Sequence, residues 1–220
     1  MGIPHAILVP YPAQGHVIPM MELMQLLVKQ GLLNDLPSLV SIPDGLGAGE
    51  NRFDLGKLSD AIYRVMPEKL EELIERLNGN DDGEKVTCIV ADTCMGWAFG
   101  VAKKMKIKTF WPAAGVVLAS LICIPKFIED GIIDNKGTLM KKQVVQLSPT
   151  MPAITSSDFT WLSIGDIKTQ QSLFDLILKA NEFMELADRI FCNSTYELEP
   201  TTFTSFPNIL PIGPLLASNC

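Results

Sequence analysis

Apolar residues along the chain occur alternately in short runs and in helical stripes, a pattern typical of α/β proteins. The run at 6–10 (AILVP) is followed by a turn-rich segment and then, over 17–31, by apolar side chains at helical spacing. The apolar positions of that stripe are Met20, Leu23, Met24, Leu27 and Val28. Gly31 is a typical helix end. The opening therefore predicts a strand, a tight turn and a helix, the first unit of a parallel sheet.

The rest of the chain continues this alternation. Further strands are predicted at 39–45, 86–92, 107–113, 189–193 and 209–215. Further helices are predicted at 54–79, 96–105, 114–131, 172–187 and 197–206. Pro67 is expected to break or kink the first of these helices, and 131–168 predicts a loop. The order of elements predicts an α/β fold with a Rossmann-like parallel sheet and helices on both faces.

Composition and charge narrow the classes of function. The 220 residues are 47% hydrophobic and 20% charged, as in a globular protein with its own core. Eighteen basic against 25 acidic residues give a net charge of −7, which argues against nucleic-acid binding. The N-terminus lacks the basic segment and cleavage site of a signal peptide, and the longest apolar run, 113–125, is too short to span a bilayer. We therefore expect a cytoplasmic protein without a membrane span.

The cysteines are odd in number and widely spaced. They are Cys88, Cys94, Cys123, Cys192 and Cys220. The sequence contains no C-x-x-C pair and has only two histidines, His5 and His16. We therefore expect reduced thiols and no metal site.

Three glycines in one loop invite comparison with a dinucleotide-binding motif. Gly45, Gly47 and Gly49 are spaced as its beginning, but Glu50 and Arg52 stand where the third glycine of G-x-G-x-x-G would be needed. We therefore interpret this loop as a flexible connection.

Three features follow predicted strands at the edge where open parallel sheets bind ligands. They are His16 in the PAQGH turn, Asp92 after VTCIVA, and Trp111-Pro112 after IKTF. A neutral His16 can take a proton near pH 7, and Asp92 can accept the other ring N–H and hold the tautomer. Alternatively, the two residues only cap their helices. Since 76 positions separate them, spacing leaves both interpretations open.

The same residues carry a resemblance to the plant family-1 UDP-dependent glycosyltransferases. The resembling segments are, in order, HAILVPYPAQGHVIPMMELMQLLVKQG, LVSIPDGL, CIVADTCMGWAFGVAKKMKI, TFWPAAG, ADRIFCNSTYELEP and ILPIGPLL. Within that family the chain most resembles branch 83.

The resemblance implies the N-terminal half of a GT-B fold, which has two Rossmann-like domains. The N-terminal domain of such an enzyme holds the acceptor, and the C-terminal domain holds the UDP-sugar. Residues 1–213 are then expected to form the acceptor domain and residues 214–220 to begin the interdomain linker. The C-terminal donor domain is expected to be absent from this chain.

The resemblance also implies the reaction and the residues that perform it. His16 falls on the family's base and Asp92 on its partner, while Gly15, Trp111 and Pro112 fall on the surrounding substrate-binding positions. The reaction is the inverting transfer of a hexose, glucose by expectation, to a hydroxyl of a small plant metabolite. The UDP-sugar is a co-substrate, bound only if a C-terminal domain is supplied, and no cofactor is implied.

Two departures from the family pattern add expectations. Many members have a further strand after the first helix, but here Gly31 runs into LLNDLPSLVSIPDG, so we expect the sheet to lack one strand. Many members also have Thr or Ser after the FW pair, where Pro112 and Ala113 stand. As a truncated chain, the protein is expected to be inactive alone. The alternative function is a non-catalytic module that binds a small molecule or a partner protein.

Overall fold

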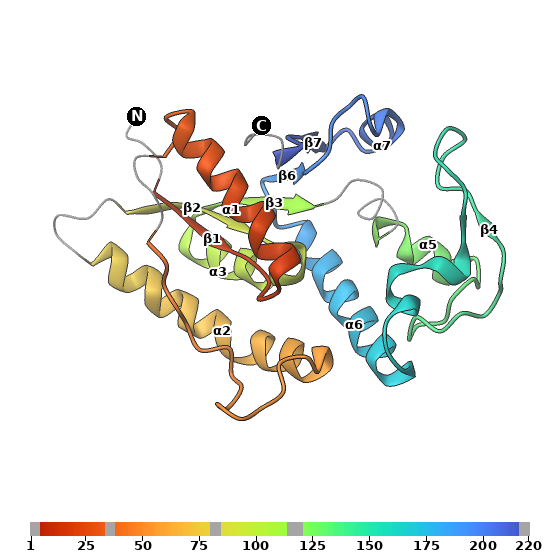
Figure 1. Ribbon diagram of the computed structural model, residues 1–220, viewed down its shortest axis with the longest axis horizontal. Coiled ribbons are helices and arrows are strands. Elements are labelled where there is room, and N and C mark those ends of the chain that lie inside the picture. The colour runs from red at the N-terminus through yellow and green to blue at the C-terminus, as the bar shows by residue number, and fades with distance from the viewer. Residues whose placement is uncertain (1–4, 34–37, 80–84, 114–120, 216–220) are drawn as a thin grey trace.

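A five-stranded parallel sheet forms the centre of the molecule (Figure 1). The computed structural model describes residues 5–33, 38–79, 85–113 and 121–215, without the side chains of Lys108 and residues 110–113. The strands are β1 (His5–Val9), β2 (Val86–Ala91), β3 (Lys108–Ala113), β6 (Arg189–Cys192) and β7 (Ile209–Pro211). Their order is β1-β2-β3-β6-β7, and every neighbouring pair is parallel. The predicted Rossmann-like α/β fold is confirmed.

Helices cover both faces of this sheet. They are α1 (Gln14–Lys29), α2 (Leu55–Asn78), α3 (Trp97–Met105), α5 (Ile124–Glu129), α6 (Ile167–Met184) and α7 (Pro200–Ser205). Successive residues of β2 alternate between the two faces, as in any strand. Ile89 and Ala91 pack in the cluster formed with α2 and α3, whereas Val90 packs with Leu23 of α1 and with Leu215. None of the helices in the described ranges is long and apolar enough to cross a membrane.

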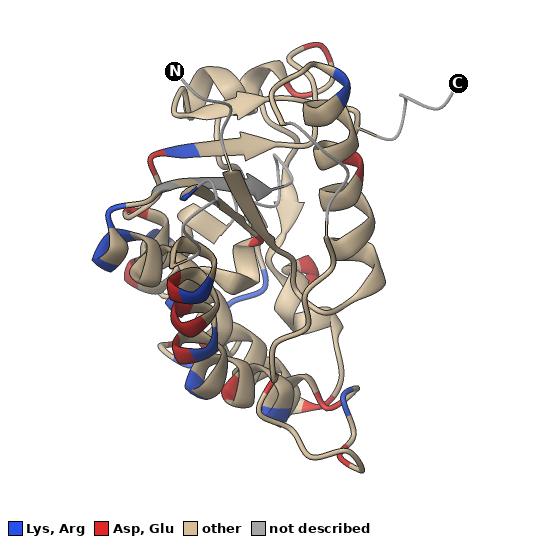
Figure 2. Ribbon diagram, turned by 90° about the vertical axis from the view of Figure 1, so that its left-hand side faces the viewer, with Lys and Arg blue, Asp and Glu red and all other residues tan. Residues whose placement is uncertain are grey.

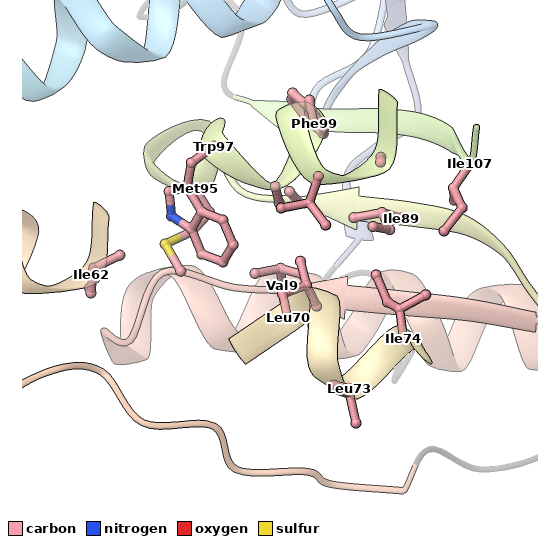
Figure 3. Close-up of a cluster of buried hydrophobic side chains, with 14 of the residues drawn as sticks. Val9, Ile62, Leu70, Leu73, Ile74, Ile89, Met95, Trp97, Phe99 and Ile107 are labelled. Carbon is pink, nitrogen blue, oxygen red and sulfur yellow. The ribbon is translucent and has the colours of Figure 1, made fainter. Parts of the chain in front are cut away.

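Helix α2 continues through Pro67, so of the two expected effects of this proline, a break or a kink, the break does not occur. Proline removes one backbone hydrogen bond, but side chains on both sides of it are anchored in the core. Ile62 precedes the proline and Leu70 and Ile74 follow it, and each is at most 1% exposed (Figure 3). Packing along the whole helix therefore outweighs the local cost.

Charged residues of both signs are interspersed on the helical surface (Figure 2). Along α2 they form ion pairs, with Lys69 Nζ 2.6 Å from Glu72 Oε1 and Glu71 Oε1 2.5 Å from Lys104 Nζ of α3. Such exposed pairs stabilise a protein little. The acidic tract of this helix is thus a mixed, solvated face.

The predicted strand at 39–45 does not form. Residues 38–44 belong to no strand, and Leu39 and Val40 are 85% and 51% exposed. Pro43 has no N–H to donate to a neighbouring strand. In the described part of the chain β1 pairs only with β2, which agrees with the expectation that the sheet lacks a strand.

The segment 131–168, expected to be a loop, contains a second apolar cluster. Its strand pairing in the described structure consists of the two-residue antiparallel pair of β4 (Val144–Val145) and β5 (Ile154–Thr155) and one isolated bridge between Ile133 and Leu139. Phe159 stacks between Phe127 and Trp161, with both ring-centroid distances 4.9 Å. The Trp161 indole N–H donates to Gly137 O at 2.9 Å. These side chains lack periodicity, so the cluster could not be read from the pattern.

The remaining predicted helices differ from the observed helices mainly in where they begin and end. Helix α6 begins five residues before the predicted start, because Asp166 caps it by accepting from the Thr169 N–H. Helix α7 begins at Pro200, a favoured first position. Of the predicted helix at 114–131, residues 114–120 lie outside the described residues and α5 covers 124–129.

The packing of the aromatic cluster leaves no space for a side chain at Gly137, which can be tested by substitution. Its φ is +73°, and a Cβ added there would overlap the ring of Phe174, which is fully buried. We expect Gly137→Ala to lower the free energy of unfolding by about 1–3 kcal/mol, measured by urea denaturation. Gly49→Ala is the matched control, because its Cβ would meet no atom within 4 Å. Equal unfolding midpoints for the two variants would contradict this packing.

Candidate active site

The candidate site lies where β1 and β2 end at the same edge of the sheet. Val9 pairs with Ala91 in the parallel register, so the residues that follow the two strands are neighbours. The backbone N–H of Asp92 donates to Val9 O at 3.0 Å and extends this pairing by one residue. After β1 the chain turns through Tyr11 into α1, whose third residue is His16. The fold thus joins two residues that are 76 positions apart.

His16 and Asp92 form a side-chain hydrogen bond. The imidazole Nδ1 is 2.9 Å from Asp92 Oδ2. The N-cap of α1 is Ala13, and no side chain caps this helix, so His16 does not have the capping role that the sequence left open. The ring of Tyr11 packs beside the imidazole, with centroids 5.2 Å apart and planes tilted by 56°. The imidazole is therefore held from two sides.

Asp92 makes both of the contacts that the two alternative interpretations require. Its Oδ1 accepts from the backbone N–H of Cys94 at 2.8 Å and caps the short 3-10 helix η1 (Thr93–Met95). Its Oδ2 is the oxygen that faces His16. The cap therefore fixes the orientation of the carboxylate that holds the histidine.

The charge of Asp92 sets the protonation behaviour of His16. The hydrogen bond to the carboxylate raises the pKa of the imidazole above its usual 6.5, while partial burial opposes this. A carboxylate only accepts, so the proton of the neutral ring lies on Nδ1 and Nε2 keeps a lone pair. The His16 side chain is 40% exposed and that of Asp92 only 10%. Such an imidazole can take a proton from a hydroxyl placed at Nε2.

Cys94 completes the immediate surroundings of the pair, and sequence reasoning did not single it out. Burial, and to a lesser extent the nearby Asp92 carboxylate, raise the pKa of its thiol well above the usual range. The thiol is therefore protonated and a poor nucleophile. One donor atom each of His16, Asp92 and Cys94 lie within 4.8 Å of one another. The only sequence signal was the position of Cys94 two residues after Asp92.

The three expected substrate-binding residues are placed only in part. Gly15 is exposed in the first turn of α1, and a Cβ there would meet no protein atom within 4 Å. Trp111 and Pro112 belong to β3, where Phe110 pairs with Val90 of the neighbouring strand, so their backbone comes level with the end of β2. Their side chains lie outside the described residues.

Comparison with known proteins relates the chain to one group of enzymes. No protein-family model matches it. It is 40% identical to UDP-glycosyltransferase 83A1 of Arabidopsis thaliana, over 98% of this chain and 53% of that protein. It is 28% identical to linamarin synthase 1 of Manihot esculenta, over 97% of this chain and 52% of that protein. The chain therefore spans about half the length of the curated relatives it matches.

The alignment with the Arabidopsis protein also bears on the missing strand. It extends over 245 positions, more than the 220 residues of this chain. The relative therefore has internal residues that this chain lacks. This agrees with the short connection after Gly31 and with the position of β1 at the end of the described sheet.

Solved structures show the same fold. A UDP-glucosyltransferase from Polygonum tinctorium, in complex with 3,4-dichloroaniline, matches with a TM-score of 0.72 and 21% identity, over 97% of this chain and 53% of that one. Phytolacca americana UGT2, complexed with UDP-2-fluoroglucose and pterostilbene, matches with a TM-score of 0.67 and 21% identity, over 98% and 55%. By its sequence, the chain belongs to the plant UDP-glycosyltransferase family, and it spans about half the length of the two curated relatives compared above.

Proposed function

We propose that this chain is the acceptor-binding part of a UDP-dependent glycosyltransferase that inverts the configuration of the transferred sugar. Residues 1–213 form the acceptor domain, and residues 214–220 begin the linker to a donor domain. The observation that carries the proposal is the 2.9 Å bond between His16 and Asp92 at the ligand-binding edge of the sheet. The family membership of the chain supports the same chemistry.

In the proposed reaction His16 is the general base. Its Nε2 takes the proton of an acceptor hydroxyl while the hydroxyl oxygen attacks the anomeric carbon of the UDP-sugar. UDP leaves from the opposite face, and the configuration at that carbon inverts. Asp92 stabilises the imidazolium that forms, because its carboxylate accepts from Nδ1–H throughout. The transition state has oxocarbenium character, as in glycoside hydrolysis.

The substrates of the proposed reaction are a hydroxylated small plant metabolite and a UDP-hexose, with UDP-glucose the expected donor. Two of the matching structures support this class, since one is complexed with UDP-2-fluoroglucose and pterostilbene and another with UDP. The UDP-sugar acts as a co-substrate, and the proposed steps need no separate cofactor. Gly15, Trp111 and Pro112 are proposed to face the substrates.

We also propose that the protein works in the cytoplasm. The four cysteines in the described residues, Cys88, Cys94, Cys123 and Cys192, are free thiols. Free thiols are usual in the reducing environment of the cytosol.

The proposed base is tested by joining this chain to the donor-binding half of UDP-glycosyltransferase 83A1. With UDP-glucose and a panel of phenols and flavonoids, we expect transfer that His16→Ala lowers by about 10²–10⁴-fold in kcat, the usual contribution of a general base. His5→Ala is the matched control, because His5 begins β1 at the end away from the site. Unchanged turnover in His16→Ala would overturn the assignment.

The same assay separates the two functional alternatives. The 220 residues alone are expected to show no transfer from UDP-glucose. If the joined protein also shows none but calorimetry detects acceptor binding to the chain, the non-catalytic binding module is the better description. Transfer by the chain alone that disappears in His16→Ala would support the base and contradict the need for a donor domain.

The Asp92 bond predicts the pH behaviour of His16. NMR titration of the imidazole should give a pKa above the free value of about 6.5, and Asp92→Asn should lower it. Since the base acts when neutral, the acid limb of the pH–rate profile should move to lower pH in this variant. The raised pKa also means that the pair stabilises the fold at acidic pH and loses this effect as pH rises through the folded pKa. Identical titration curves for both proteins would contradict the bond.

Gly15 offers a separate test of substrate proximity. Because Gly15→Ala adds a methyl group that meets no protein atom within 4 Å, in a helix where alanine is favoured, its melting temperature should not fall. If substrate approaches this backbone, the same change should raise KM in the joined protein. An unchanged KM would remove Gly15 from the site.

A further inference from the structure

We propose that His16, Asp92 and Cys94 form a binding site for Zn²⁺. The three residues come from α1, from the end of β2 and from η1, and one donor atom of each lies within 4.8 Å of the others. The two strands bring them together, which is why the spacing of cysteines and histidines along the sequence led us to expect no metal.

The donor set suits zinc and not a hard cation. It offers one imidazole nitrogen, one carboxylate oxygen and one thiolate sulfur, the three ligand types that Zn²⁺ takes in proteins. Mg²⁺ and Ca²⁺ prefer all-oxygen sites. Three protein ligands leave a fourth tetrahedral position for water, as in open zinc sites.

The distances need only a small adjustment. Tetrahedral Zn²⁺ with ordinary bond lengths holds its ligand atoms about 3.4–3.6 Å apart. His16 Nδ1 and Asp92 Oδ2 are now 2.9 Å apart, so they separate slightly to admit the ion. Cys94 Sγ, which lies within 4.8 Å of a ring nitrogen of His16 and of a carboxylate oxygen of Asp92, moves closer by roughly 1.2–1.4 Å at most. The Cys94 thiol releases its proton to solvent as it binds.

Existing contacts prepare the ligands. The Asp92 carboxylate is anchored through Oδ1 by the backbone N–H of Cys94, which leaves Oδ2 for the ion. The Tyr11 ring orients the imidazole. Outer contacts of this kind typically strengthen metal binding. The 40% exposure of the His16 side chain provides the route by which the ion enters.

Occupation of this site would switch off the base, a consequence that rests on the proposed function. The ion takes the Nδ1 lone pair, so the ring proton must move to Nε2. A protonated Nε2 cannot take a proton from an acceptor hydroxyl. Zinc is therefore an inhibitor of the proposed reaction and not its cofactor.

The site is tested on this chain alone by titration with Co²⁺, which replaces zinc and reports bound thiolate by a charge-transfer absorption band. We expect one Co²⁺ per chain, a thiolate band, and loss of the band when Zn²⁺ is added but not when Mg²⁺ is added. No sugar or acceptor is present, so the result is independent of glycosyl transfer. Binding without a thiolate band, or no binding, overturns the proposal.

Substitutions of the three proposed ligands test which residues give rise to the Co²⁺–thiolate band. Cys94→Ala should abolish it, and His16→Ala and Asp92→Asn should weaken Co²⁺ binding by more than about 10-fold, since even loss of an outer contact costs that much. Cys88→Ala, a half-buried thiol on β2 outside the cluster, is the matched control and should keep the band. Circular dichroism checks each fold. If Cys94→Ala does not fold, His16→Ala decides, because its ring is partly exposed; a band unchanged in that variant overturns the proposal.

Discussion

The hydrogen bond from the Asp92 N–H to Val9 O is the contact on which the site depends. It continues the parallel pairing of β1 and β2 beyond the last paired residues, Val9 and Ala91. Because both strands then end at one level, the turn into α1 and the turn into η1 leave the sheet side by side. A shift of one residue in this register would turn the side chains of one strand to the other face. The contact between His16 and Asp92 therefore follows from strand pairing and needs no loop of special shape.

Asp92 shows why a structural and a catalytic interpretation need not compete. A carboxylate has two oxygens and can serve two donors at once. One oxygen caps η1 and the other holds the imidazole, so the cap limits the rotation of the group that positions the proposed base. Cys94 supplies both the capping N–H and the nearby half-buried thiol. A substitution of Asp92 or Cys94 would thus affect both the local fold and the orientation and protonation of the His16 imidazole.

Much of the fold could be predicted from the sequence, because it rests on local patterns. The rule for open parallel sheets indicated His16 and Asp92 as candidates at one sheet edge, but the spacing left the role of the pair open. Apolar periodicity located α1, and a strand followed by an acidic residue located β2 and Asp92. The interpretation of 39–45 as a strand was wrong. Apolar content favours a strand only where a neighbouring strand covers the side chains, and here Leu39 is left exposed and Pro43 has no N–H to donate. The cluster around Trp161 could not be predicted, since it joins residues of 131–168, which lack periodicity, to the helices α5 and α6. Cys94 was missed because its importance arises only from tertiary proximity.

The long separation between β1 and β2 has a consequence for the newly made chain. About 80 residues lie between the end of β1 at Val9 and the end of β2 at Ala91. At about 5–20 residues per second, the ribosome needs roughly 4–16 s to make the partner that β1 requires. During this time the apolar segment HAILV has no strand to pair with, although α1 can already form from local contacts. The nascent protein therefore passes through an interval in which chaperone binding to its first strand would protect it from association.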